Sequence, residues 1–213
     1  MRNKRDKNSQ WNVPGVANEL FARKAGSKFN SQLLVSGPQF GRYALGYRLV
    51  ADTVVEGLRG RMGHVVVFPV CYLYRHYLEL KIKHLTSLAK FVLYEEHTYL
   101  TGHELGDLWK ECRPLLEKTM PDRSKAGFDT VGNCVDAFAS FDFKGDYSRY
   151  PIDMRGRDWK QSVKDLSLQR MRDAISDVAD LLDTFYYQMD NILECRNLHS
   201  AEAASHTDVC EQQ

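Results

Sequence analysis

The sequence predicts an all-α fold, a helical bundle of five or six helices with a long ordered loop near residues 140–160. Two observations support this prediction. Apolar side chains recur about every 3.6 residues over 70–94 and again over 171–192. In addition, only six prolines interrupt the 213 residues, and most stand where a helix would begin or end. A hydrophobic content of 43% in a chain of this length suits one folded domain.

Residues 1–36 form a basic amino-terminal arm that is expected to contain a short helix. Seven basic and two acidic side chains fall within residues 1–30. Pro14, preceded by Asn12, suits the first turn of a helix that would run to about Lys24.

The bundle itself is expected over residues 37–196, followed by a flexible tail over 197–213. Glycine-rich GLRGRMG ends the first long helix, and Pro121 lies beyond the end of the third. The helices are expected over 40–58, over 70–94, from Thr101-Gly102 towards Leu116, over 122–138 and over 167–194.

Composition and charge exclude several classes of protein. The 29 basic side chains nearly balance the 28 acidic ones, so a net charge of +1 gives no general argument for nucleic-acid binding. Five widely spaced cysteines without a Cys-x-x-Cys pair indicate reduced thiols and a cytoplasmic protein. The longest apolar run, 65–74, contains Pro69 and is about half the roughly 20 residues of a membrane helix. A soluble protein with no membrane segment is therefore expected.

One polar stripe on the central predicted helix is a candidate site. Offsets of three, four and seven residues return to the same side of a helix, so four side chains of FPVCYLYRHYLELKIKHL share a face. These are Arg75, His76, Glu79 and Lys83. The stripe is either a solvated face held by pairs four residues apart, or, if the helix is central, the wall of a polar pocket.

Two further segments could complete such a pocket. His103 lies at a predicted helix start in TGHELGDLW, where it acts as a capping residue or joins the stripe. In DYSRYPID, Pro151 biases Tyr150 towards extended backbone, so that Arg149 and Asp153 project from a rigid loop. Arginine there suits bidentate capture of phosphate, or it docks the loop onto Glu79 or another carboxylate of the bundle.

Four of these segments together carry a family resemblance. GYRLVAD, FPVCYLYRHYLELKIKHL, GHELGDLW and YSRYPID, followed by a long terminal helix, resemble a family of uncharacterised bacterial helical-bundle proteins similar to the HEPN class, over roughly residues 43–193. The resemblance implies an all-α bundle that is frequently dimeric. The class includes nucleotide-binding modules and metal-independent endoribonucleases of toxin and phage-defence systems.

One departure from the class concerns its nuclease motif. Active HEPN ribonucleases resemble one another in an arginine followed, after four to six residues, by a histidine on a late helix. Arg196 and His199 are too close for this spacing. Arg59 and His64 match it, but a chain with this many arginines and histidines contains about one or two such matches by chance.

These observations lead to a functional hypothesis and one rival. The hypothesis is a HEPN-like nucleotide- or RNA-directed protein, including an endoribonuclease toxin or a phage-defence component. It is a homodimer that needs no cofactor. His76 and His103 would be the catalytic acid and base, and the phosphate- or ligand-binding residues would be Arg75, Glu79, Lys83, Arg149, Tyr150 and Asp153. The rival is a non-enzymatic helical interaction module, in which the same residues form a buried polar network.

A metal site is considered only in the tail. Cys195, His199, His206 and Cys210 have a spacing that could surround zinc. Alanine, serine and threonine around them indicate a frayed terminus, so no metal is expected.

Overall fold

The computed structural model describes residues 26–28, 39–59, 62–142, 144–159 and 165–210, with side chains described as far as His199. The chain divides into two units, Met1–Pro38 and Gln39–Gln213, and every helix described here belongs to the second. The short helix expected between Pro14 and Lys24 lies outside the described residues.

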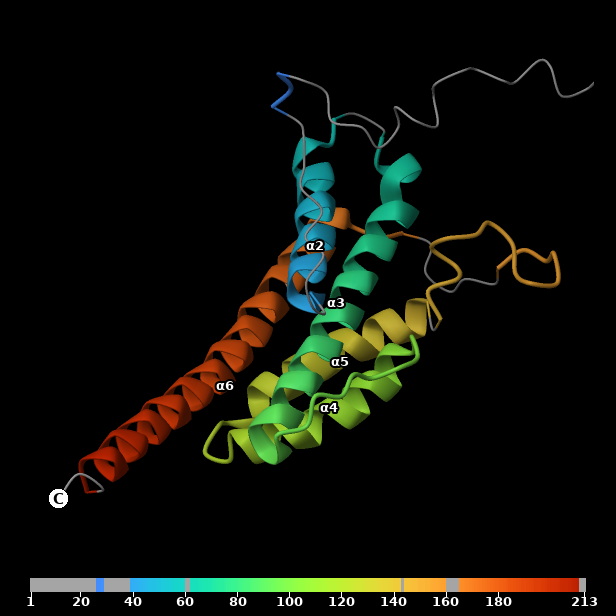
Figure 1. Cartoon of the computed structure of the whole chain (residues 1–213). Coiled ribbons are helices and arrows are strands. Elements are labelled where there is room, and N and C mark those ends of the chain that lie inside the picture. Colours follow the sequence, from blue (N-terminus) through green and yellow to red (C-terminus); the bar gives the residue numbers. More distant parts are fainter. Residues whose placement is uncertain (1–25, 29–38, 60–61, 143, 160–164, 211–213) are drawn as a thin grey trace, which may run out of the picture. The chain divides into compact units, whose positions relative to one another are not determined.

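Five helices make up the second unit over its described residues (Figure 1). They are α2 (Phe40–Gly57), α3 (Gly63–Tyr94), α4 (Leu105–Thr119), α5 (Lys125–Phe141) and α6 (Leu168–Cys210). The same residues contain no strand, only one isolated antiparallel bridge between Ile152 and Asp158. The predicted all-α bundle is therefore confirmed. No described helix combines the length and the hydropathy that a membrane span requires.

Helix α3 lies at the centre of this unit, in contact with α2, α4 and α6 (Figure 1). Tyr74, Leu78 and Leu85 are buried on one side of it. Arg75 and Glu79 are equally buried on the other, each with only 2% of its surface exposed. Because neighbours cover nearly the whole circumference, the polar stripe lies inside the protein and is not a solvated face.

Helix α3 also begins earlier than expected. It begins at Gly63 rather than near Val70, and it contains Pro69. Pro69 is the seventh residue of the helix, past the four amides at the start that lack a helical partner, so it removes the one hydrogen bond that residue 69 would donate to the Val65 carbonyl while the helix continues. The proline therefore does not mark the start of this helix.

Helix α6 is longer than expected. The helix was expected to end at about Glu194, but it continues to Cys210 through most of the segment expected to be a flexible tail. That segment contains no glycine or proline after Leu198 and includes the strong helix formers Ala201, Ala203 and Ala204. The predicted apolar stripe of α6 is buried, with Ile175, Val178, Leu182, Phe185 and Met189 each at most 2% exposed.

Candidate functional site

A pocket of about 630 Å³ opens where α3 meets the segment before α4 and the loop after α5. Three stretches supply its lining: α3, residues 101–111 and residues 144–149. The polar lining side chains are Tyr72, Arg75, His76, Glu79, Thr101, His103, Glu104, Asp107, Glu111, Lys144, Asp146 and Arg149.

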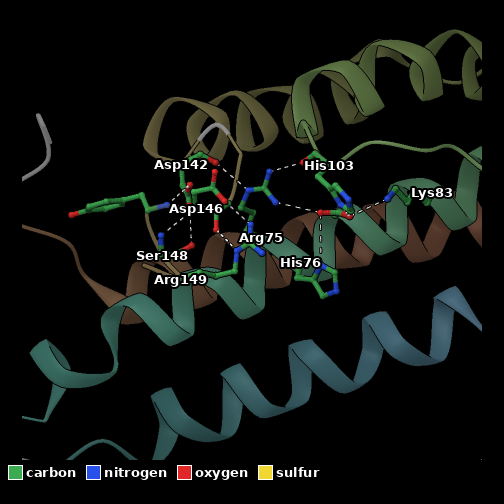
Figure 2. Close-up of polar contacts among 11 residues, drawn as sticks. Arg75, His76, Lys83, His103, Asp142, Asp146, Ser148 and Arg149 are labelled. Carbon is green, nitrogen blue, oxygen red and sulfur yellow. Dashed lines mark hydrogen bonds and ion pairs between the residues drawn. The ribbon is translucent and has the colours of Figure 1, made fainter. Parts of the chain in front are cut away.

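Glu79 is the centre of the polar contacts (Figure 2). Its carboxylate accepts a hydrogen bond from Lys83 Nζ at 3.0 Å and pairs with Arg75 Nη1 at 3.3 Å. His103 Nδ1 lies 2.8 Å from Oε1, and His76 Nδ1 lies 3.7 Å from Oε2, an ion-pair distance rather than a hydrogen bond. The fold therefore brings the whole predicted stripe and His103 onto one carboxylate.

The charge state of Glu79 follows from these contacts. Burial raises the pKa of this carboxyl, but the interactions with His76, His103 and Lys83 lower it more, to about 2. The carboxylate is consequently ionised at neutral pH and can only accept hydrogen bonds. The proton between the two groups must then belong to His103 Nδ1, so Nε2 of a neutral His103 ring is unprotonated.

The two histidines differ in their surroundings. The His103 side chain is 74% exposed, so solvent and ligands can reach it. The His76 side chain is 21% exposed and lies between two aromatic rings. Tyr72 stacks on it with ring centroids 5.6 Å apart, and Tyr47 meets it edge-on at 4.4 Å. These rings limit the orientations of the His76 imidazole.

Arg75 connects three parts of the site. Its Nε donates to the backbone carbonyl of Asp142 at 3.0 Å, and its Nη2 donates to that of His103 at 2.6 Å. Asp142 follows the last residue of α5, so the guanidinium lies at the negative end of that helix. Arg75, predicted to bind phosphate, here joins α3 to the end of α5 and to the segment before α4.

The loop after α5 is held by a residue that the sequence analysis missed. The Asp142 carboxylate accepts hydrogen bonds from the backbone amides of Tyr147 at 3.1 Å and Ser148 at 3.0 Å, and from the Ser148 hydroxyl. Asp142 is buried, with 4% of its surface exposed. An aspartate a few residues beyond the predicted helix 122–138 and shortly before Gly145 was the available signal, since such residues accept from the amides of a following turn.

Arg149 lines the pocket, and its hydrogen bonds are to its own loop and not to Glu79. Its Nε donates to the Gly145 carbonyl and its Nη2 to Asp146 Oδ1, both at 2.7 Å. The guanidinium also lies over the rings of Tyr72 and Tyr150, at 5.7 and 5.5 Å from their centroids. The expected docking of this arginine onto Glu79 is therefore not observed, because its hydrogen-bond partners lie in its own loop.

The remaining predicted ligand-binding residues lie apart from the pocket. Lys83 is buried behind Glu79 and does not line it. Tyr150 and Asp153 line a separate cavity formed by the following residues of the loop. Asp153 accepts two hydrogen bonds from the Arg157 guanidinium and one from the Arg157 backbone amide, and these contacts lower the pKa of its carboxyl.

The lining contains more acids than bases. Arg75, Lys144 and Arg149 supply three positive charges, against the five carboxylates of Glu79, Glu104, Asp107, Glu111 and Asp146. The three acids contributed by α4 and its start were missed. These acids are three and four residues apart, a spacing that places them on one helix face and could have revealed them.

No group of three or more His, Cys, Asp or Glu side chains is arranged to hold a metal among the residues that the structure describes. Cys195 and His199 belong to that part, whereas the side chains of His206 and Cys210 lie outside it. Searches against protein-family models, curated proteins and solved structures returned no match to this chain.

Proposed function

We propose that this pocket is the site of a nucleotide- or RNA-directed protein similar to the HEPN class, with His76 and His103 as an acid–base pair that works without a metal. One observation supports the proposal above all others. The Nδ1 atoms of both histidines face a single buried, ionised carboxylate, Glu79, at an open pocket. A carboxylate in that position orients an imidazole and stabilises its protonated form.

The chemistry that fits this pair is cleavage of RNA by its own 2′-hydroxyl. Nε2 of His103 takes the proton of the 2′-hydroxyl, whose oxygen then attacks the adjacent phosphorus. As the bond to the 5′-oxygen breaks, protonated His76 donates its proton to that oxygen. The products are a 2′,3′-cyclic phosphate and a 5′-hydroxyl end, so neither water nor a protein nucleophile is consumed in this step.

Cleavage in the presence of a chelator tests this proposal. End-labelled RNA incubated with the protein and EDTA should yield fragments ending in 2′,3′-cyclic phosphate. His103→Asn and His76→Asn should each slow cleavage by about 10²–10⁴-fold, the usual effect of losing a general acid or base. His64→Asn is the matched control, because His64 is exposed and outside the pocket. If His64→Asn abolishes cleavage while the pocket variants retain it, the site is wrongly assigned.

Expression in cells provides a second test of the same function. An endoribonuclease of the toxin or defence type should arrest growth and leave discrete cut sites in sequenced cellular RNA. The His103→Asn variant should do neither at an equal protein level. Intact RNA at full expression of the wild-type protein would contradict the proposal.

A non-enzymatic helical interaction module is the second candidate. The observation that favours it is that Arg75 donates to two backbone carbonyls and to Glu79, as expected of a residue that fixes packing. In that case, His103→Asn would change thermal stability, and the wild-type protein would neither cleave RNA nor bind nucleotides.

Self-association is also part of the proposal, because it is common in the similar class. Light scattering at micromolar concentration should give a mass near twice that of the 24.5 kDa chain. A mass equal to one chain would contradict it.

A further inference from the structure

The loop after α5 carries a second feature beside the pocket, residues 149–159, here called the hairpin. It extends away from the helices, coloured gold in Figure 1. Its apolar side chains are exposed: Tyr150 is 55%, Ile152 46% and Met154 100% exposed. Exposed aromatic and aliphatic groups at one place on a surface indicate a binding surface.

The hairpin is held by its own contacts. The Trp159 indole donates to the Tyr150 carbonyl at 2.9 Å, and the backbones of Ile152 and Asp158 form a bridge. Trp159 also packs edge-on against Tyr147, which packs against Phe141 of α5. These contacts fix the backbone at Tyr150 relative to α5, so ordering the hairpin backbone on binding costs little conformational entropy.

The charge of the hairpin complements the pocket. Asp153 accepts from the backbone amides of Arg155 and Arg157 and pairs with the Arg157 guanidinium. The exposed Arg155 side chain has no such pairing among the described residues. Since five carboxylates and only three cations line the pocket, an anionic strand needs positive charge outside it, and Arg155 of the hairpin supplies one.

The two cavities are separate but adjoin each other. Asp146 lines both the pocket and the cavity of about 560 Å³ at the hairpin. The Arg149 guanidinium contacts Tyr72, which lines the pocket, and Tyr150 of the hairpin. A chain bound along the hairpin would consequently be led to the histidines.

We infer that the hairpin binds single-stranded RNA and directs it into the pocket, an inference that rests on the proposed function. Tyr150 stacks on a base, and Arg155 and Arg149 meet the phosphates. Aromatic stacking combined with positive charge is the usual way of holding a single strand without reading its sequence. The inference adds a substrate form to the proposed site, because a duplex would not present an unstacked base to Tyr150.

Fluorescence anisotropy with a short 2′-O-methyl single-stranded RNA tests this inference, since that RNA cannot undergo cleavage by its own 2′-hydroxyl. Tyr150→Ala should weaken binding roughly tenfold, the usual effect of losing one stacked base. Arg155→Ala should reduce the slope of log affinity against log salt by about 0.7, the effect of one phosphate contact. Tyr43→Ala and Arg42→Ala are matched controls on α2, where Tyr43 is 62% exposed, and both should bind as the wild type does.

Several outcomes would overturn the inference. These are no binding by the wild-type protein, equal losses in the α2 controls, or a preference for double-stranded RNA or for an acidic peptide. The two proposals also fail in different ways. Hairpin-dependent binding of RNA without any cleavage would support the hairpin and contradict the acid–base site. Cleavage that depends on His103, together with binding that the hairpin variants do not affect, would support the acid–base site and contradict the hairpin.

Discussion

Gly145 lies against the guanidinium of Arg75, so closely that a Cβ atom at this position would be 2.9 Å from Nη1. Its backbone also has a positive φ of 76°, which side-chain-bearing residues rarely adopt. The loop that forms one wall of the pocket therefore depends on a residue without a side chain, and it is fastened by the same arginine that pairs with Glu79.

Replacing Gly145 should destabilise the protein more than replacing a glycine with the same backbone. Gly156 has a φ of 72° and nothing within 4 Å of a built Cβ, so Gly156→Ala should cost only the roughly 1–2 kcal/mol of the left-handed conformation. Gly145→Ala adds a clash with a buried guanidinium and should cost clearly more. Urea unfolding of both variants measures this difference. Equal losses would show that Arg75 moves aside freely.

Removing the Glu79 carboxylate should be among the more damaging single changes in the protein. Glu79→Ala leaves Arg75 and Lys83 buried without their counter-charge, which typically costs about 3 kcal/mol or more. Glu117→Ala is the control, because Glu117 pairs with Arg113 at a partly exposed position and should lose less than about 1 kcal/mol. Denaturant unfolding measures the loss of stability in each of the two variants. A loss at Glu79 no larger than at Glu117 would contradict the buried network.

The low pKa of Glu79 predicts how stability depends on pH. Its pKa falls from the usual 4.5 to about 2 on folding, so the unfolded chain binds the proton first as the pH drops. The contribution of Glu79 is complete above pH 4.5 and is lost as the pH falls towards 2. Subtracting the unfolding free energy of Glu79→Gln from that of the wild type at each pH should expose this loss. A difference that stays constant across the window would contradict the assignment.

The anchor of Arg149 can be identified by double-mutant cycles. Arg149 binds Asp146 but not Glu79 in the observed contacts, so Arg149→Ala and Glu79→Ala should add to within about 0.5 kcal/mol. Arg149→Ala combined with Asp146→Ala should instead be less destabilising than the sum, by up to about 1 kcal/mol for a partly exposed pair. Coupling to Glu79 alone would show that the loop is docked differently in solution.

Hydrophobic periodicity was enough to predict the helices. The expected helix over 40–58 corresponds to α2, Phe40–Gly57, and the stripe from Ile175 to Met189 is the buried face of α6. The grouping of Arg75, Glu79 and Lys83 was also readable, because residues four apart share a helix face whatever surrounds it. The start of α3 and the end of α6 were predicted less well. A proline near the start of a helix and an alanine-rich tail are both compatible with helix, but neither requires it.

Whether the polar stripe faces water or the interior depended on how many helices cover α3. That number cannot be predicted from the sequence of α3 itself. The sequence also could not predict that Arg75 binds the backbone carbonyls of His103 and Asp142, because every residue has the same backbone acceptor. Side-chain spacing along a helix is a local property and can be read from one segment. The partners of a buried charge come from segments far away in the chain, so only packing could bring His103 and Asp142 to Arg75 and Glu79.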